Sequence, residues 1–475
     1  MTRKKNSMNH TDLPNNNPKP IDLCIVGGGL AGISAALEAR RLHPDWRIVL
    51  TESRSRLGGR AGSFIDPKTT NWVDNCQHVG LGCCSALIDF VNRLGSPDAF
   101  RRVPELKFLG PDGRVDTIKG SRFLPAPLHL APAFAMLRFL SNWDKFTLGF
   151  GLLKLALTPP RWLRGKSVAK WLKSNGQTPR SIKRMWEPVL VSALNDDLEQ
   201  LDLANARQVF VESFFKTRDG FHLLVPAMPL GELFDERARL ALSAQQIEVI
   251  CNMNCQSIQS HENQFHLQFR GKENFIAERI IIATPWTIAS EILKSMNEVK
   301  LNPITKLINQ LKPSPITGIH LQLDRKICPH SEIALLDTTT QWIFDHTEAD
   351  RRQAGCILPP DGQSLHIVVS ASHELARKSR DEILEVIIEE LKTAFPEMQS
   401  STILSSWVVT EHAATFSPSP GIDSIRPTSL TPIKGLFLAG DWTQTGWPAT
   451  MEGAIRSGLN AAQTMTDLTI IDHIS

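Results

Sequence analysis

The first hydrophobic run of the chain ends in a group of glycines and gives way to a helical pattern. Residues 21–26 are mostly apolar, and after the glycines apolar side chains recur at Leu30, Ile33 and Leu37 until Pro44 ends the pattern. Such a pattern predicts a buried strand, a tight turn and a helix. The folded part of the chain is therefore expected to begin with a strand–turn–helix unit.

The glycines of this turn have the spacing G-x-G-x-x-G, filled by Gly27, Gly29 and Gly32. The first glycine permits the turn, the second lets a pyrophosphate approach the backbone, and the third lets the helix pack closely on the strand. The backbone N–H groups at the helix start, at Leu30 and Ala31, would then face the phosphates. Glycine-rich turns also serve packing alone, so the residues that follow decide between the two interpretations.

A second apolar run supplies the acid that such a site requires. It covers residues 47–51 and is followed by Glu52, twenty residues after Gly32, where a carboxylate can hold a ribose hydroxyl. Two glycines and several arginines come next and indicate a loop that faces phosphates, although a solvated basic loop has the same composition. The candidate residues of this loop are Ser53, Arg54, Gly58, Gly59 and Arg60.

A second glycine-rich turn lies near the C-terminus. An apolar run at residues 435–439 leads into Gly440 and Asp441, and a helical pattern with Pro448 near its start follows. A helix N-terminus carries roughly +0.5 of an elementary charge and would stabilise negative charge on a reduced flavin. Asp441 would hold a ribityl or ribose hydroxyl. The residues expected at this helix start are Ala449, Thr450, Met451 and Glu452.

The remaining hydrophobic pattern divides the chain into alternating segments. Residues 279–284 predict another buried parallel strand, residues 265–269 alternate as a half-buried antiparallel strand does, and Ser379 with Glu382 predicts a capped helix. We therefore predict an α/β fold, in which a Rossmann-like dinucleotide-binding domain is interleaved with an α+β substrate-binding domain. The expected segments are a disordered tail over 1–20, dinucleotide-binding parts at 21–104, 206–290 and 416–475, and substrate-domain parts at 105–205 and 291–415.

Composition and charge exclude several classes of protein. The 475 residues include 52 basic and 49 acidic side chains without one dominant basic run, so we expect no nucleic-acid partner. The eight cysteines lack a paired metal-ligand spacing, and we expect reduced thiols in a cytoplasmic protein with no metal site. The chain has no tyrosine, so acid/base chemistry must come from other side chains.

The segment at residues 105–205 has a different character. Apolar helical stretches at 133–140 and 146–157 are interspersed with lysine, arginine and tryptophan. Helices of this composition lie at a membrane surface, but a pair of ordinary core helices has the same pattern, and both interpretations stand at this point. No run reaches the ~18 apolar residues of a membrane span. We expect a cytoplasmic protein that is either free or peripheral on the inner face of the membrane.

Together these motifs resemble a known group of flavoproteins. The GGGLAG turn, Glu52 and the RSRLGGR loop are similar to the FAD-binding module shared by amine oxidases and phytoene-type desaturases. DNCQHVGLG at 74–82, TFSPSPG at 415–421 and LAGDWTQTGWPATMEGAIRSG at 438–458 narrow the resemblance to hydroxysqualene dehydroxylases, also called squalene-associated FAD-dependent desaturases. The resemblance runs from about residue 21 to 465.

The resemblance implies FAD that is bound without a covalent link and a long hydrophobic isoprenoid substrate. The reaction would replace the hydroxyl of hydroxysqualene by hydrogen, which gives squalene for hopanoid or sterol synthesis. By the same resemblance, Cys255 would contact the adenine through its backbone, and residues 449–452 would meet the isoalloxazine. No second glycine motif for NADPH is visible, so the electron donor stays unidentified.

Removal of a hydroxyl group requires a proton, so a general acid is expected close to the departing oxygen. His78 is the first candidate and His412 the second. An oxidative desaturase of the carotenoid or phytoene type, or an amine oxidase, is the rival within enzymes. The rival from another class is a non-enzymatic protein that binds isoprenoids on the same fold.

Overall fold

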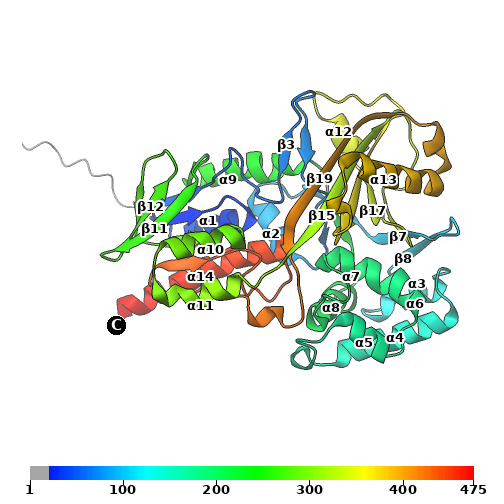
Figure 1. Ribbon diagram of the computed structural model, residues 1–475, viewed down its shortest axis with the longest axis horizontal. Coiled ribbons are helices and arrows are strands. Elements are labelled where there is room, and N and C mark those ends of the chain that lie inside the picture. The colour runs from blue at the N-terminus through cyan, green and yellow to red at the C-terminus, as the bar shows by residue number, and fades with distance from the viewer. Residues whose placement is uncertain (1–20, 475) are drawn as a thin grey trace, which may run out of the picture.

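A parallel sheet of five strands joins segments from the start, the middle and the end of the chain (Figure 1). The computed structural model describes residues 21–474, so the tail predicted over residues 1–20 lies outside the described residues. The strands, in spatial order, are β10 (Glu248–Ile250), β2 (Ile48–Thr51), β1 (Leu23–Val26), β14 (Ile280–Ile282) and β20 (Leu436–Leu438). Except for β10 at the edge, these strands are buried throughout, as expected for a parallel sheet covered on both faces.

The two faces of this sheet are covered by different elements. In β1, Leu23 and Ile25 belong to one hydrophobic core, whereas Cys24 and Val26 belong to the other. Helices form the first cover: α1 (Leu30–Leu42), α2 (Ser85–Arg93), α9 (Ala238–Ala244) and α14 (Met451–Ile474). The second cover consists of α10 (Trp286–Ser295), α11 (Asn302–Ile308) and an antiparallel sheet of β11 (Cys255–His261), β12 (Gln264–Phe269) and β13 (Phe275–Ala277).

A second large sheet has seven strands and lies on the other side of the molecule (Figure 1). Its order is β19 (Ile403–Phe416), β15 (Pro313–Leu323), β18 (Gln363–Ser370), β17 (Trp342–Asp345), β16 (Glu332–Leu335), β7 (Glu105–Leu109) and β8 (Val115–Lys119). Helix α13 (Arg380–Ala394) packs on this sheet, and α12 (Thr347–Arg351) precedes β18. The capping box predicted for α13 is confirmed, because Ser379 and Glu382 exchange side-chain-to-backbone hydrogen bonds.

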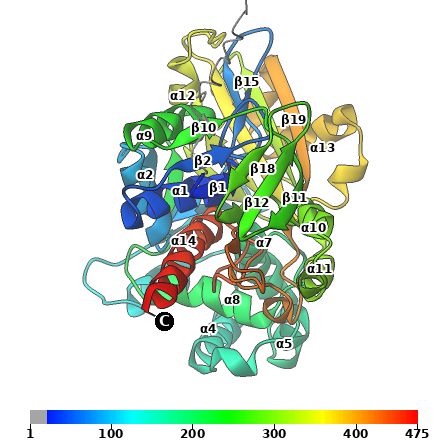
Figure 2. The same cartoon turned by 90° about the vertical axis from the view of Figure 1, so that its left-hand side faces the viewer.

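A group of helices lies below the second sheet (Figures 1 and 2). It contains α3 (Ala131–Met136), α4 (Asn142–Leu157), α5 (Val168–Ser174), α6 (Pro179–Ser181), α7 (Glu187–Leu194) and α8 (Leu203–Phe210). π-Helical turns at 182–186, 211–215 and 232–237 lead out of or into neighbouring helices. Short sheets, β3 (Ser63–Ile65) with β4 (Trp72–Asp74), and β5 (Gly80–Leu81) with β9 (Leu223–Pro226) and β6 (Phe100–Val103), link the two sides.

The hydrophobic cores place two segment boundaries later than the sequence predicted. Phe214 and Phe221 pack in the same core as α4, so the helical part continues beyond residue 205. Helices α10 and α11 pack on the five-stranded sheet, so the dinucleotide-binding part continues beyond residue 290, to about Leu311. The sequence could not place these two boundaries, because an apolar helix face indicates that another element covers it but not which element does.

Three buried histidines form a cluster on the seven-stranded sheet, where His366 stacks on His346 and meets His320 edge-on. The ring of His366 lies 3.9 Å from that of His346 and 4.2 Å from that of His320, measured between centroids. Burial lowers the pKa of His320 to about 4 and that of His346 to about 3, and it lowers the pKa of His366 as well. All three rings are therefore neutral near pH 7.

This cluster should make the fold sensitive to acid. The unfolded imidazoles take up protons near pH 6.5, whereas the folded ones do not until about pH 4, so the free energy of unfolding should fall as the pH drops through that window. His346→Phe keeps a ring against His366 and removes one titrating group. In this variant, the free energy of unfolding measured by urea denaturation should change less steeply with pH than in the wild type, by up to about 1.4 kcal/mol per pH unit. The exposed His261→Phe is the control, and equal slopes in both variants would contradict the assignment.

Candidate functional site

The turn between β1 and α1 brings two backbone segments into direct contact. A Cβ atom on Gly32 would lie 1.9 Å from the carbonyl oxygen of Gly27, so only glycine fits there. Gly27 itself has φ +117°, in the region that favours glycine. Gly29 caps α1 without a side-chain hydrogen bond, and the N–H groups of Leu30 and Ala31 begin the first turn. This helix start is therefore suited to an anion.

Glu52 lies beside this turn with its carboxylate held in place. One carboxylate oxygen accepts a hydrogen bond from the Gly28 N–H at 2.7 Å, and the other accepts from the Arg54 N–H at 2.8 Å. The Ser53 hydroxyl also donates to Glu52. The side chains of Ser53 and Arg54 are exposed, whereas Glu52 is buried. The orientation of Glu52 is thus set by the backbone around it, as a ribose-binding acid requires.

The arginine loop closes over the glycine turn. Gly58 donates its N–H to the carbonyl oxygen of Gly28 at 2.9 Å. A Cβ atom on Gly59, which has φ +61°, would lie 3.1 Å from the Cα of Gly29. The phosphate-facing loop predicted from the sequence therefore lies directly against the turn it was expected to complete.

Arg60 connects the first part of the site to the last. Its guanidinium donates to the Asp441 carboxylate at 2.5 Å and to the Ala414 carbonyl oxygen at 2.7 Å. It also lies over the ring of Trp286, 5.9 Å from the centroid. Asp441 is buried and follows Gly440, whose N–H donates to the Ser457 hydroxyl at 2.7 Å. The two glycine-rich turns, far apart in sequence, thus form one site.

The start of α14 has two roles that the sequence did not separate. Thr450 caps the helix, because its hydroxyl accepts from the N–H of Gly453 at 3.1 Å. The side chain of Glu452 was expected near the isoalloxazine, but it is buried and accepts from the N–H groups of Ala86 and Leu87 at the start of α2. The predicted contact of residues 449–452 with a flavin stays a prediction, and their backbone N–H groups, rather than the Glu452 carboxylate, would make it.

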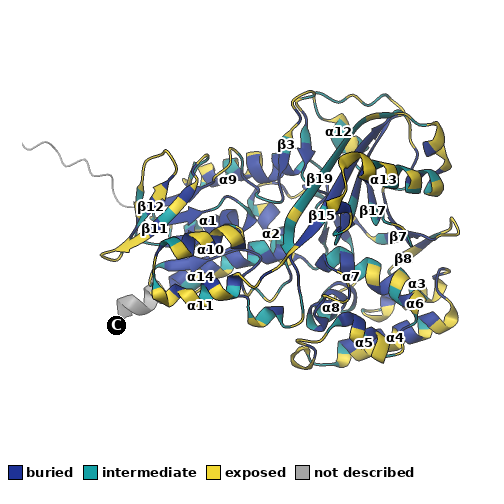
Figure 3. Ribbon diagram, in the orientation of Figure 1, coloured by how far each residue is buried: buried dark blue, intermediate teal, exposed yellow. Residues whose placement is uncertain are grey.

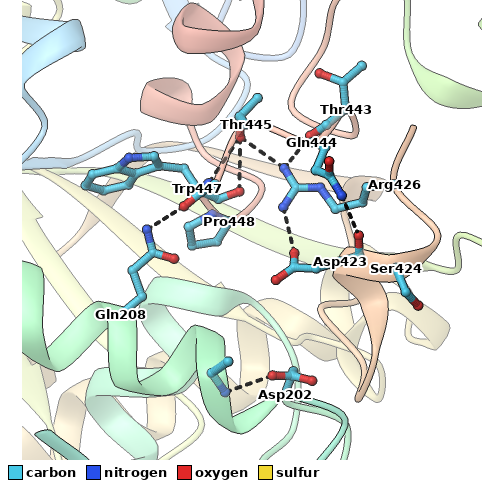
Figure 4. A network of polar contacts seen from close by, with 12 residues as sticks. Asp202, Gln208, Asp423, Ser424, Arg426, Thr443, Gln444, Thr445, Trp447 and Pro448 are labelled. Carbon is cyan, nitrogen blue, oxygen red and sulfur yellow. Dashed lines mark hydrogen bonds and ion pairs between the residues drawn. The ribbon is translucent and has the colours of Figure 1, made fainter. Parts of the chain in front are cut away.

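A buried arginine that the sequence analysis missed shapes the loop before α14 (Figure 4). Arg426 donates to the carbonyl oxygens of Asp441 and Thr443 and to the Thr445 hydroxyl, and it pairs with Asp423 at 3.2 Å. The loop is tied to α8 as well, since the Gln208 amide donates to the Gly446 carbonyl. Arg426 follows TFSPSPG by only a few residues, but nothing local in the sequence indicates that it folds back onto the loop.

Cys255 begins β11, two residues after Met253, whose N–H donates to the carbonyl oxygen of Glu52 at 2.8 Å. The Cys255 thiol is buried, and burial raises its pKa to about 12. All eight cysteines are free thiols, which agrees with the sequence prediction. A contact from the backbone of Cys255 to an adenine stays a prediction.

The two candidate histidines differ in their surroundings. His78 is half-buried, and its Nδ1 lies 2.8 Å from the carbonyl oxygen of Cys76, which can only accept, so Nδ1 carries the proton. Burial lowers the pKa of His78, the Cys76 carbonyl opposes this shift, and the charge of Arg60 adds to it. At neutral pH, Nε2 of His78 is therefore an acceptor rather than an acid. His412 is exposed on β19, two residues before Ala414.

The described residues fit FAD. The glycine turn at the start of α1 has no Cβ in the way and suits the pyrophosphate. The fixed carboxylate of Glu52 beside it suits the ribose. The second helix start, joined to the first by Arg60, suits the flavin. Residues 30–466 match the family described as flavin containing amine oxidoreductase. The chain belongs to this family. It is an FAD-dependent oxidoreductase, and the predicted cofactor and fold class are confirmed.

Individual relatives divide between two activities. The chain is 28% identical to hydroxysqualene dehydroxylase of Zymomonas mobilis over 92% of this chain and 97% of the relative. It is 24% identical to zeta-carotene desaturase of Arabidopsis thaliana over 96% of this chain and 87% of the relative. Among solved structures, a putrescine oxidase variant has a TM-score of 0.70 at 15% identity, over 95% of this chain and 99% of that one. The structural similarity supports the fold, and the choice of reaction needs a further argument.

The glycine turn offers a sharp test of the cofactor site. Gly29→Ala adds a Cβ that meets no protein atom closer than 3.9 Å, so the thermal midpoint Tm of the apoprotein should stay unchanged. The same Cβ faces the place where a pyrophosphate would approach, so we expect the affinity for FAD to fall at least about tenfold. Gly32→Ala is the matched comparison, and its clash with Gly27 should lower the Tm itself. Unchanged FAD titrations of Gly29→Ala would contradict this location of the cofactor.

Proposed function

We propose that this flavoenzyme carries out the reductive dehydroxylation of hydroxysqualene to squalene. The observation that carries the proposal is the 28% identity to hydroxysqualene dehydroxylase over nearly the whole length of both chains. The segment at 438–458, which resembles that group in sequence, contains Asp441 of the Arg60–Asp441 pair. The segment at 74–82, which also resembles that group, contains His78, whose pKa the charge of Arg60 helps to lower. A cytoplasmic location and a separate electron donor belong to the same proposal.

The reaction is balanced as a two-electron reduction. The allylic C–O bond breaks, the oxygen leaves as water after it gains one proton, and the carbon gains a hydride. Reduced FAD, when bound, supplies that hydride. The protein must hold the substrate carbon at the flavin and exclude water, because water would recapture the allylic cation.

His78 is the residue of this chain that we place at the departing oxygen. With Nδ1–H donated to Cys76, the Nε2 of His78 accepts a hydrogen bond from the substrate hydroxyl and so orients the C–O bond. The acid that protonates the oxygen is then the second candidate, His412, which is exposed and can exchange protons with water. This divides between two histidines the work that the sequence analysis gave to one.

The reaction itself can be tested directly. FAD-loaded protein is reduced with dithionite without oxygen and incubated with hydroxysqualene, and squalene should form in proportion to the flavin reoxidised. The oxidised protein should leave hydroxysqualene unchanged. If the oxidised protein instead introduces double bonds into zeta-carotene or phytoene, or oxidises an amine, the proposed reaction is wrong and the corresponding rival is right.

The role of His78 predicts the pH dependence of catalysis. Because its pKa lies below 6.5, an acceptor role requires kcat/KM to fall as the pH drops below that value, whereas an acid role requires a fall as the pH rises. In His78→Gln the fall of kcat/KM on the acid side of the pH profile should disappear. The value of kcat/KM should drop by only about tenfold, since glutamine can still accept a hydrogen bond. His412→Gln should reduce kcat, and the exposed His261→Gln should change neither value. Unchanged turnover of His78→Gln would remove this residue from the mechanism.

The runner-up is an oxidative carotene desaturase, favoured by 24% identity to zeta-carotene desaturase over 96% of this chain. Both candidate functions require a hydrophobic isoprenoid substrate, so the two are distinguished by whether the reduced or the oxidised flavoprotein reacts. A non-enzymatic isoprenoid-binding role conflicts with the preserved FAD cradle at Gly29 and Glu52.

A further inference from the structure

Half of the large hydrophobic side chains that the structure exposes lie in one short stretch. Nine of the eighteen among the described residues fall between residues 123 and 162. Scattered exposed apolar residues are ordinary, but a concentration of this kind marks an interaction site. We call this the α4 surface, and it consists of Phe123, Leu128, Met136, Trp143, Phe146, Phe150, Leu153, Leu157 and Trp162.

Helix α4 provides the centre of the surface. Its five exposed apolar side chains recur every three or four residues from Trp143 to Leu157, so they form one stripe along one face. Phe146 stacks on Trp143 with 5.5 Å between ring centroids. Figure 3 shows α4 at the outer edge of the helical group, with exposed positions along it and along α5.

The outward orientation of this stripe is fixed by the opposite face of α4. Ser141 and Asp144 form a capping box at its start, and the buried Asp144 also accepts from the Thr178 hydroxyl at 2.5 Å. On the same buried face, a Cβ atom on Gly151 would lie 2.6 Å from the Gln177 amide, which also donates to the Thr147 carbonyl. The helix cannot rotate to bury its stripe without breaking these contacts.

Almost all charged side chains in the part of the chain around α4 are positive. Between Asp116 and Glu187 there are thirteen lysines and arginines and a single acidic residue, the buried Asp144, although the whole chain has a net charge of only +3. Several of these cations pair with acids elsewhere, as Arg138 does with Asp116. Eight form no ion pair with any described residue: Arg122, Lys145, Lys154, Arg161, Arg164, Lys166, Lys170 and Lys173.

We propose that the α4 surface docks on the face of an anionic lipid bilayer. Exposed tryptophan and phenylalanine insert at the lipid interface, and unpaired lysine and arginine around them meet the lipid phosphates. A second copy of the chain would bring two surfaces of the same positive sign together, which disfavours it as the occupant. The contact is peripheral, because none of the described helices is long and apolar enough to cross a membrane.

Vesicle binding by the full-length, FAD-loaded protein tests this proposal without any substrate. Wild-type protein should co-sediment with vesicles of phosphatidylcholine containing about one third phosphatidylglycerol, and less with pure phosphatidylcholine. Phe150→Glu combined with Leu157→Glu should reduce the partition coefficient at least about tenfold. Leu240→Glu on α9, 64% exposed, is the matched control and should bind as wild type does.

A second variant keeps the test valid if the first one unfolds. Arg161→Gln, Arg164→Gln and Lys166→Gln together should weaken binding to the anionic vesicles and leave the flavin absorbance and the Tm unchanged. The proposal is overturned if wild-type protein ignores the vesicles or if both variants bind as wild type. It is also overturned if the substitutions only dissociate a dimer in sedimentation. None of these results bears on squalene formation, so the two proposals fail separately.

Discussion

The cofactor site depends on the direct contact between the backbones of α1 and α14. A Cβ atom on Gly458 would lie 2.2 Å from the carbonyl oxygen of Ala31 and 2.7 Å from the backbone nitrogen of Ala35, so at this position the two backbones are in direct contact. The Ser34 hydroxyl donates to the Ile455 carbonyl at 3.0 Å across the same contact. Because β1 and β20 both lie next to β14, the two helices also begin at neighbouring points of one sheet edge. This geometry brings two helix N-termini to one cofactor.

The same contact makes the site a property of the complete chain. Arg60 and Asp441 are 381 residues apart, and Glu452 caps α2 from 365 residues away. Neither charged group can find its partner until the last segment of the chain has returned to the sheet that the first segment began. Such non-local contacts cost loop entropy before they give stability. The sequence predicts an order of segments, but the contacts between the segments follow only from the assembled sheet.

Local chemistry explains which parts of the structure the sequence could predict. Gly27 and Gly32 are needed by a turn of a few residues, and the spacing of the glycines shows it. The capping box before α13 is equally local. Arg426 was missed because its acceptors are loop carbonyls that only the fold brings to it. The histidine cluster was missed for the same reason, since its rings come from β15, β18 and the end of β17. The contacts of the Glu452 side chain were also missed, because its partners are backbone N–H groups of α2 that only the fold brings to it.

Helix α4 shows how a hydrophobic pattern can leave two interpretations open. Both of its faces are apolar, which is typical of a helix buried all round. The face with Gly151 is narrow and packs on Trp186 and Gln177, so it belongs to the core. The other face bears the bulky residues from Trp143 to Leu157, and no described element covers it. Eight lysines and arginines of the same part of the chain form no ion pair with a described residue, and the proposed anionic lipid surface would satisfy both their charge and the apolar stripe.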